Sequence, residues 1–269
     1  MTDTWRFIDT GPCSAAYNMS LDEAIAVAVR QDKSPPTLRT YGWSSNAVSI
    51  GCFQRINDIN IDYCYNNNIP IVRRPTGGRA IFHGNEITYS FSAKIKSGIF
   101  SKGLLDSYRK ISTALGLALR MLDLSPELKL MREANHLRSA SDSQKNPLCF
   151  RSISFGEVAI GGKKIVGSAQ KRWPDGLLQQ GSIPFIIDRN EMTEIFRSNS
   201  FRGIKESMIG LKEIAPRLDY QKLKNAFRAS FEETFDTKFI FTSPSEEEIS
   251  HALELETRKY LSHEWNFRR

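Results

Sequence analysis

The sequence predicts an α+β fold, in which a mixed β-sheet is flanked by helices and followed by a short helical extension at the C-terminal end. Strand-like segments cluster in the first two-thirds of the 269 residues, and helical segments cluster in the last third. Hydrophobic residues make up 40% and charged residues 25%, which is typical of a soluble globular protein and excludes a disordered or fibrous chain. We expect one domain over residues 1–269, with a core over about 5–215 and a helical part over about 216–269.

Helix and strand signals alternate in the first half of the chain. Ser20-Leu-Asp-Glu23 matches a capping box that opens an amphipathic helix running to about Arg30, before Pro35-Pro36. Alternating apolar residues and turn signals predict strands over 37–43, 47–53 and 69–74, with a short helix over 59–67. A strand–turn–strand hairpin is expected over 79–94, with its turn at Gly84-Asn85.

The second half begins with the clearest helix signal, an apolar stripe at helical spacing over 104–122. The polar run within 134–147 predicts a mobile surface loop. Gly161-Gly162 predicts the turn of a hairpin between 155–160 and 164–167, and a further strand is expected over 176–185. Helical segments are predicted, in order, over about 190–198, 219–235 and 245–262, the last opened by Ser245-Glu-Glu-Glu248.

The sequence also excludes several classes of protein. No run approaches the ~18 consecutive apolar residues of a membrane span, and residues 1–10 lack the apolar core of a secretory signal. The four cysteines form no C-x-x-C pair, so zinc and thioredoxin-like motifs are unsupported, and we expect reduced thiols in a cytoplasmic protein. Dinucleotide-binding, P-loop, nucleophile-elbow and zinc-protease motifs are absent. The net charge of +7 favours an acidic partner.

Residues 73–83, Arg-Arg-Pro-Thr-Gly-Gly-Arg-Ala-Ile-Phe-His, form the first cluster that suggests chemistry. A strand ends in Arg73 and Arg74, two glycines then expose backbone N–H groups, and Arg79 follows. Because glycine has no Cβ, this segment can approach a phosphate, a carbonyl or a developing oxyanion closely. A tight turn with solvated arginines is the alternative, but the three arginines followed by His83 favour a binding site.

Cys149 and the segment 162–170 form the second cluster. Lys164 begins a strand next to Gly167-Ser168-Ala169, a run of small residues that leaves room for a substrate against the backbone. An ammonium held near a thiol stabilises the thiolate, which can accept an acyl group and pass it on, so Cys149 and Lys164 are candidate partners in acyl transfer. Taken singly, a buried cysteine and a solvated lysine are the alternatives, and periodicity does not show that the two residues meet in space.

Together these segments resemble the lipoate–protein ligase and octanoyltransferase family, over roughly residues 5–190. Asn18-Met-Ser-Leu-Asp-Glu-Ala24 is similar to the N-terminal helix motif of that family. Residues 73–83 are similar to its acyl-binding loop, and Lys164-Ile-Val-Gly-Ser-Ala169 matches its K-x-x-G-S-A signature. The resemblance implies the fold of the biotin/lipoate protein ligase catalytic domain.

Within the family, the details most resemble the cysteine-dependent octanoyltransferases. His83-Gly-Asn-Glu-Ile-Thr-Tyr-Ser90 resembles their His…Glu-Leu-Thr-Tyr-Ser segment, and Cys149-Phe150 lies fifteen residues before the signature lysine, as in that group. Gln179-Gln-Gly-Ser-Ile183 resembles the Q-H-G-S-I that follows. The chain departs from the group at Gln180, where His is usual, and over 151–155.

The resemblance implies a two-step acyl transfer without ATP or metal. Octanoyl-acyl carrier protein would acylate Cys149, and a lysine of a lipoyl-accepting domain (glycine cleavage H protein or a 2-oxoacid dehydrogenase E2) would then take the octanoyl group as an amide. Lys164 would lower the pKa of the Cys149 thiol and hold the acyl carbonyl. The implied substrate-binding residues are Arg73, Arg74, Thr76, Gly77, Gly78, Arg79, His83, Gly167 and Ser168.

Three other interpretations stay open at this stage. An ATP-dependent lipoate ligase would use Arg73, Arg74, Gly78 and Lys164 to hold an acyl-adenylate, with ATP and Mg as cofactors. An amidotransferase would move the acyl group between two lipoyl domains. A basic nucleic-acid-binding protein would explain the charge, but the cations are spread along the chain rather than concentrated, so we expect neither nucleic acid nor membrane as a partner.

Overall fold

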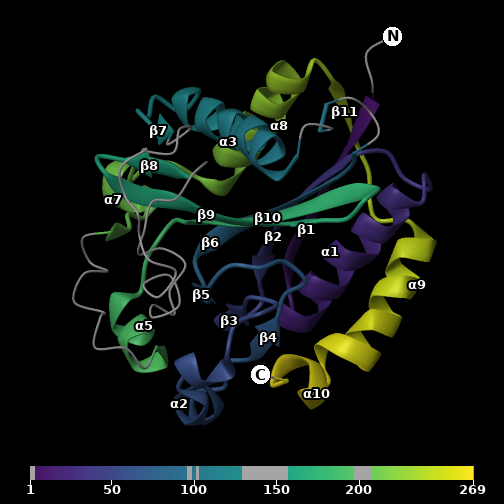
Figure 1. Cartoon of the computed structure of the whole chain (residues 1–269). Coiled ribbons are helices and arrows are strands. Elements are labelled where there is room, and N and C mark those ends of the chain that lie inside the picture. The colour runs from purple at the N-terminus through teal and green to yellow at the C-terminus, as the bar shows by residue number, and fades with distance from the viewer. Residues whose placement is uncertain (1–3, 96–98, 101–102, 129–156, 197–206, 269) are drawn as a thin grey trace.

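The computed structural model describes residues 4–95, 99–100, 103–128, 157–196 and 207–268. Within these residues a mixed sheet runs in the order β11-β1-β2-β6-β10-β9-β8-β7 (Figure 1). Its strands are β1 (Thr4–Cys13), β2 (Thr37–Trp43), β6 (Glu86–Lys94), β7 (Glu127–Leu128), β8 (Val158–Ile160), β9 (Lys163–Arg172), β10 (Gly176–Pro184) and β11 (Lys238–Phe241). β1 pairs in parallel with β2 and β11, and the other pairings are antiparallel. The predicted mixed sheet with flanking helices is therefore confirmed.

A second, smaller sheet lies beside the first and has the order β4-β3-β5. It contains β3 (Ala47–Ile50), β4 (Ile71–Arg73) and β5 (Ile81–His83). The predicted hairpin over 79–94 is wrong, because β5 pairs with β3 whereas β6 pairs with β2 and β10. Residues 86–93 of β6 are all buried, so this strand requires a partner on each edge within the large sheet. The chain thus crosses from one sheet to the other at Gly84-Asn85.

Helices cover both faces of the large sheet (Figure 1). α3 (Leu104–Arg120) and α8 (Tyr220–Phe235) pack on one face, where an aromatic core contains Trp5, Phe91 and Phe231. α1 (Ala15–Arg30) and α9 (Glu246–Leu255) pack on the other face, which they share with the small sheet. The remaining helices and turns are η1 (Ile56–Asp58), α2 (Ile61–Asn66), α5 (Arg189–Ile195), α7 (Leu211–Ile214), η3 (Glu256–Tyr260) and α10 (His263–Asn266).

Of the two predicted helix start signals, the structure confirms the one at α9 and contradicts the one at α1. Ser245 and Glu248 form the predicted capping box of α9. The box at Ser20–Glu23 is wrong, because α1 begins at Ala15 with Ser14 as its N-cap. Ser20 instead donates to the carbonyl of Tyr17 within the helix (2.9 Å), and Glu23 accepts from Lys259 and Tyr260. Ser20 and Glu23 have the spacing of a capping box, but Ser20 bonds within α1 and Glu23 bonds to the C-terminal segment.

The remaining boundaries lie close to the predicted ones except at β9, which extends to Arg172 instead of Gly167, and three strands were not predicted. The hairpin at Gly161-Gly162 forms, with both glycines at positive φ. The segments 245–262 and 47–53 are shorter as regular elements, since α9 ends at Leu255 before a π-helical turn and β3 ends at Ile50. β1, β7 and β11 are additional strands. The predicted loop over 134–147 lies outside the described residues, and none of the described helices has the length and apolarity needed to cross a bilayer.

Glu248 anchors α9 to the large sheet through a buried ion pair with Arg6 (Nη2–Oε1 2.6 Å). Burial acts to raise the pKa of Glu248, but hydrogen bonds from Arg6 and from the backbone N–H of Ser245 outweigh it and hold the pKa below its ordinary value of 4.5. This carboxylate therefore contributes its full stabilisation above about pH 4.5, and the contribution is lost as the pH falls through the lowered pKa.

We expect Glu248→Gln to reduce the free energy of unfolding at neutral pH and to flatten its decrease below pH 4.5. Urea unfolding across that pH range measures both effects. Glu247→Gln is the matched control, because Glu247 pairs with Lys33 at the surface with a side chain that is 75% exposed. Equal acid slopes for wild type and Glu248→Gln would contradict the assignment.

Candidate active site between the two sheets

The loop from Arg74 to Ala80 joins β4 to β5 and is wrapped around one guanidinium. Arg74 donates to the carbonyls of Gly77 and Arg79, both at 2.7 Å, and to the carbonyl of Ser49 at 3.1 Å. Gly78 has a positive φ of 83°, which a side chain would strain. The predicted glycine–arginine loop is thus folded back on its own second arginine, which lies 3% exposed.

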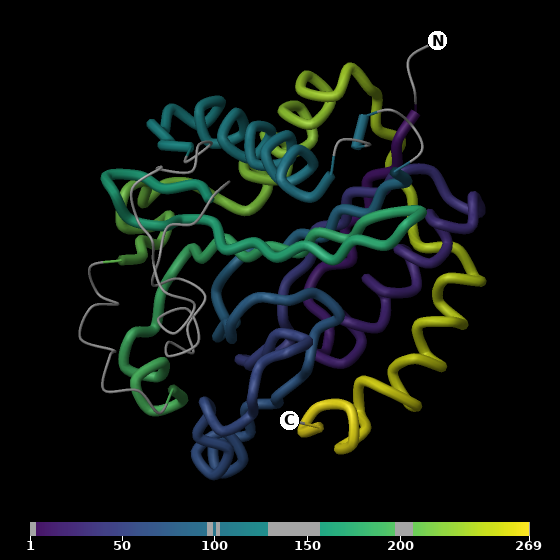
Figure 2. Tube along the Cα trace, in the orientation of Figure 1, coloured from purple at the N-terminus to yellow at the C-terminus, as the bar shows by residue number. Residues whose placement is uncertain are grey.

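Arg73 contacts the C-terminal segment and the end of β3 rather than a cavity. Its guanidinium is fully buried and donates to backbone carbonyls of Gly51 (2.9 Å), Gln54 (2.7 Å), Trp265 (3.1 Å) and Asn266 (3.1 Å). Its backbone N–H donates to the side chain of Asn266, and its carbonyl accepts from the Trp265 indole. α10 accordingly lies beside β4 (Figure 2). The C-terminal segment therefore holds the strand from which the loop leaves, and Arg73 lines neither of the cavities described below.

Gly51 sets how closely the loop can approach β3. A Cβ at this position would lie 1.9 Å from the carbonyl oxygen of Gly78, so the loop would have to move. Gly51→Ala should therefore lower catalytic turnover about 10²-fold, the scale expected when site geometry shifts by about 1 Å. Steady-state kinetics measures this effect. Gly42→Ala is the control, because its Cβ would make an ordinary 3.6 Å contact with Pro12; equal losses in the two variants would contradict the prediction.

His83 is held rigidly at the end of β5. Its Nδ1 lies 2.8 Å from a carboxylate oxygen of Glu86, and its Nε2 lies 2.7 Å from the hydroxyl of Ser49. The ring stacks on Trp43 at 3.9 Å between centroids. Ser49 also accepts from Arg74 (3.1 Å). His83 and the glycine–arginine loop are thus joined by one buried hydrogen-bond network.

Asp22 is a buried centre of hydrogen bonding that the sequence analysis did not select. Its carboxylate accepts from Arg39 (2.7 Å), Tyr41 (2.8 Å), Ser90 (2.6 Å) and Gln180 (2.7 Å). Burial, reinforced by the neighbouring carboxylate, raises the pKa of Tyr41 well above its ordinary value, so this hydroxyl stays a donor. Polar residues four apart on an otherwise apolar helix, Asn18 and Asp22, were the available signal.

Gln180 connects this centre to the loop. Its amide nitrogen donates to Asp22, and its amide oxygen accepts from Thr76 at 2.8 Å. Gln180, where the cysteine-dependent octanoyltransferases usually have His, therefore links α1 to the loop. Thr76 positions the loop through its hydrogen bond to Gln180.

Lys164 and Glu157 form a buried ion pair at the start of β9. Val158 pairs with Val166 but Ala159 pairs with Lys164, so β9 carries one extra residue in a bulge. Residues that pair across neighbouring strands point to the same face of a sheet. The bulge therefore places Lys164 on the same face of β9 as Gly167 and Ala169, which is the face toward the small sheet. The two side chains are 0% and 8% exposed.

Ser168 points to the opposite face of β9 from the one predicted to hold substrate. Its hydroxyl lies 2.8 Å from that of Tyr89, within the core under α8. Burial raises the pKa of Tyr89 to about 12. Of the predicted pair, Gly167 therefore lies on the face of β9 that borders the inner cavity, opposite Ser182 of β10.

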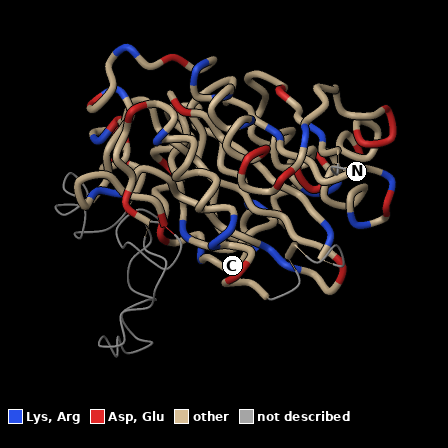
Figure 3. Tube along the Cα trace, turned by 90° about the horizontal axis from the view of Figure 1, so that it is seen from above, with Lys and Arg blue, Asp and Glu red and all other residues tan. Residues whose placement is uncertain are grey.

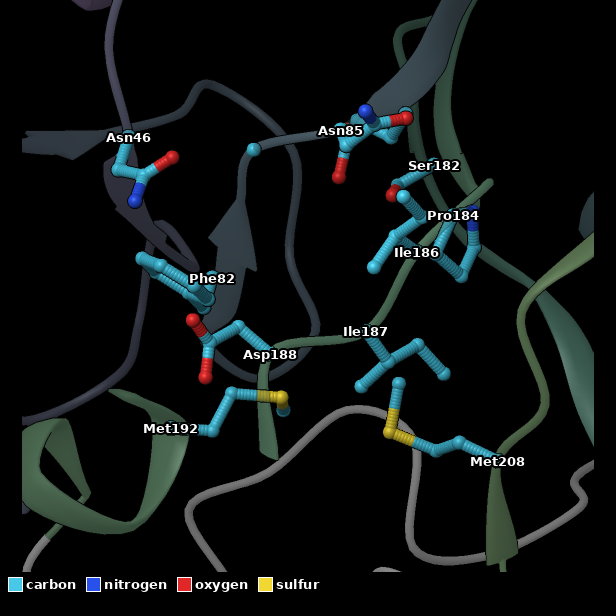
Figure 4. Close-up of a pocket in the computed structure, with 12 residues that line it drawn as sticks. Asn46, Phe82, Asn85, Ser182, Pro184, Ile186, Ile187, Asp188, Met192 and Met208 are labelled. Atoms are coloured by element: carbon cyan, nitrogen blue, oxygen red, sulfur yellow. The ribbon is translucent and has the colours of Figure 1, made fainter. Parts of the chain in front are cut away.

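A narrow inner cavity lies between the two sheets. Its apolar walls include Met19, Trp43, Ile81 and Ala169, and its polar lining includes the predicted site residues Arg74 and His83. An outer cavity of about 190 Å³ adjoins it, and Ser182 lines both (Figure 4). Met208, which lines the outer cavity, forms an isolated β-bridge with Lys164. The arrangement suits a ligand with an apolar end between the sheets and a reacting group near Lys164.

Cys149 lies outside the described residues, so its distance from Lys164 stays a prediction. The three described cysteines, Cys13, Cys52 and Cys64, are free thiols and line neither cavity. Burial, together with the nearby Glu191 carboxylate, raises the pKa of the Cys64 thiol to about 11, which keeps it protonated at neutral pH. Among the described cysteines, none is therefore placed to attack a ligand in either cavity.

Comparisons with known proteins bear on the whole chain. The family description "Lipoyl protein ligase A/B catalytic domain" matches residues 14–232. Octanoyltransferase LipM from Bacillus subtilis is 34% identical, and the alignment covers 99% of both chains. Octanoyltransferase LipM from Kyrpidia tusciae is 35% identical with the same coverage.

Solved structures agree with this chain in fold. A putative lipoate protein ligase from T. acidophilum with bound lipoic acid is 22% identical, with a TM-score of 0.79 over 99% of this chain and 100% of that one. A lipoate-protein ligase A bound with ATP is 23% identical, with a TM-score of 0.80 over 99% of both chains. A structural study of a bi-partite ligase and its E2 lipoyl domain from Thermoplasma acidophilum gives a TM-score of 0.80 at 22% identity, over 98% of this chain and 96% of that one.

Proposed function

The chain belongs to the lipoyl protein ligase A/B catalytic-domain family, and we propose that it is an octanoyltransferase of protein lipoylation. The observation that carries the proposal is 34% identity to a named octanoyltransferase along 99% of both chains. The predicted site residues Arg74 and His83 line the cavity between the sheets, which supports the same reaction class. The proposal includes the acyl donor, the Cys149 thioester intermediate and the lysine that accepts the acyl group.

In the first half-reaction, the Cys149 thiolate attacks the carbonyl carbon of octanoyl-acyl carrier protein. A bond forms between that carbon and Sγ, the bond from carbon to the carrier sulfur breaks, and the carrier leaves as a thiolate that takes up a proton. Lys164 provides the buried positive charge that stabilises the Cys149 thiolate and the developing oxyanion. Glu157 positions the Lys164 ammonium through their ion pair.

The inner cavity is the proposed site of the octanoyl chain. Burial of an alkyl chain contributes about 0.8 kcal/mol per CH₂, so an apolar slot between the sheets supplies much of the binding. In the structure this cavity measures about 20 Å³, so side chains such as Met19 and Ile81 must shift to admit eight carbons. Gly77, Gly78 and Arg79 would present the loop backbone to the acyl carbonyl.

In the second half-reaction, the neutral ε-amine of a lysine on a lipoyl-accepting domain attacks the enzyme thioester. The carbon–nitrogen bond forms, the bond to Sγ breaks, the amine loses a proton, and the cysteine thiol is regenerated. An amide replaces a thioester, so the reaction runs downhill without ATP or metal. A free cysteine nucleophile also suits a reducing compartment, and we place the reaction in the cytoplasm.

Charge supports acidic protein partners. Lys and Arg number 37 against 30 Asp and Glu, and the two signs are interspersed along the described chain (Figure 3). A moderate positive excess without a single basic stripe favours brief encounters with acidic carrier and lipoyl domains over nucleic-acid binding.

Intact-mass spectrometry after mixing with octanoyl-acyl carrier protein tests the proposed function. We expect the mass of one octanoyl group on the enzyme, removed by hydroxylamine because thioesters react with it, and transferred to an added lipoyl domain. Absence of an adduct, together with lipoylation that depends on lipoate and ATP, would assign the chain to the ligases. Transfer from an octanoylated lipoyl domain in place of the carrier protein would assign it to the amidotransferases.

A further inference from the structure

The outer cavity adjoins the inner cavity and lies beside the backbone of Lys164, whose side chain lines neither cavity. Ser182 lines both cavities, and Glu86, three residues after His83, lines the outer one. Met208, on the wall of the outer cavity, forms a β-bridge with Lys164. The backbone carbonyl of Lys164 accepts a hydrogen bond from the N–H of Ile209 (3.1 Å). A thioester whose acyl chain fills the inner cavity therefore has the outer cavity available for its thiol half.

The lining of the outer cavity combines apolar side chains with polar ones, and two carboxamide groups lie at one end. In the view of Figure 4, Asn46 and Asn85 lie at the top, and Met192 and Met208 lie at the bottom. Tyr220 donates to the Asn85 side-chain oxygen (2.9 Å), which orients the amide and directs its NH₂ group toward another acceptor. Hydrocarbon walls with amide donors at one end match a ligand that alternates methylene groups with amides.

The charge of the described lining argues against a phosphate-rich occupant of the outer cavity. Among the described residues that line it there is no Lys, Arg or His, whereas Glu86 and Asp188 contribute two carboxylates. Asp188 caps α5 by accepting from the N–H groups of Asn190 and Glu191. Anions bound in proteins are normally met by cations or by unpaired backbone N–H groups, so the triphosphate of a nucleotide is a poor match, and a neutral amide-bearing chain is a good one.

We propose that the outer cavity binds the pantetheine arm of the thioester donor, with the arm's amide groups received by Asn46 and Asn85. This inference rests on the proposed function, because it assigns the thiol half of the same donor. The acyl half then lies between the sheets, the thioester lies near Lys164, and the pantetheine arm leads outward past Phe82 and Ile186 to the carrier protein.

The test compares two small thioesters that share the octanoyl group. Octanoyl-pantetheine carries the amides, and the octanoyl thioester of 2-mercaptoethanol lacks them. We expect wild-type enzyme to be acylated with at least tenfold higher kcat/KM by octanoyl-pantetheine. Asn46→Ala, at an exposed turn residue, should reduce that ratio severalfold, and Asn46→Trp, which fills the cavity, should reduce it further. Asn225→Ala on α8 is the matched control and should keep the wild-type ratio.

A second readout does not require turnover. Titration of ¹⁵N-labelled protein with pantetheine should shift the side-chain amide resonances of Asn46 and Asn85, and should leave that of Asn225 in place. Equal kcat/KM for the two thioesters, absence of these shifts at millimolar pantetheine, or competition by ATP but not by pantetheine would each overturn the inference, and the proposed function would stand. Failure of octanoyl-acyl carrier protein and of both thioesters to acylate the enzyme would instead overturn the proposed function.

Discussion

Cys149→Ala should lower octanoyl transfer by about 10⁴-fold or more, the scale seen when the nucleophile of a covalent enzyme is removed. The reason is chemical, because without the thiolate no enzyme thioester forms and the amine must attack the donor directly in a site built for two steps. Intact-mass spectrometry should show no octanoyl adduct, and a coupled assay with octanoyl-acyl carrier protein and a lipoyl domain measures the residual rate.

Cys13→Ala is the matched control for that variant. Cys13 is a free, partly exposed thiol at the end of β1 and lines neither cavity, so transfer and adduct formation should persist. Retained activity in Cys149→Ala with lipoate and ATP would contradict the cysteine mechanism and favour ligation. An adduct that moves to another residue would show that the proposed nucleophile is misassigned.

The sequence predicts the fold best where local chemistry and tertiary structure agree. Two glycines at positive φ require the turn between β8 and β9, and Ser245 with Glu248 satisfies the N-terminal N–H groups of α9. The partner of each strand is less predictable, because pairing depends on burial elsewhere in the chain. Gly84-Asn85 has the composition of a hairpin turn, yet it carries the chain between two sheets, since β6 is buried between β2 and β10.

Two of the strands that were not predicted, β1 and β11, show a related limit. β1 alternates Trp5 and Phe7 toward the α3–α8 core with Arg6 on the other face, and this period of two was visible in the sequence. β11 is four residues long and has an exposed Phe241. Its position depends on parallel pairing with β1 at the other end of the chain, which no local pattern specifies.

The candidate site was predicted at the level of segments better than at the level of single side chains. The sequence motifs indicate the loop and β9, and both border the space between the sheets. It could not separate Arg74, which lines the inner cavity, from Arg73, which binds the C-terminal segment. Adjacent residues on an extended chain point in opposite directions, and their partners, such as Asn266, are distant in sequence. Asp22 was missed for the same reason, since its donors come from three separate strands, β2, β6 and β10.

Lys164→Met should lower octanoyl transfer about 10³-fold, because it removes the positive charge next to the proposed thiolate and oxyanion. It also removes the Lys164 ammonium from the buried Glu157 carboxylate, and breaking a buried pair on one side costs about 3–5 kcal/mol. Low activity in this variant alone would therefore not distinguish a loss of catalysis from unfolding. A variant that also replaces Glu157 is needed.

The double variant Lys164→Met/Glu157→Gln separates the two effects. Removing both charges eliminates the buried carboxylate that has lost its ammonium, so the free energy of unfolding should recover by most of the loss in the single variant, whereas transfer should stay about 10³-fold low. Urea unfolding and adduct formation monitored by mass spectrometry measure the two quantities on the same samples. If activity recovered together with stability, Lys164 would be a structural residue; if only stability recovered, the buried ammonium would be the group that the chemistry requires.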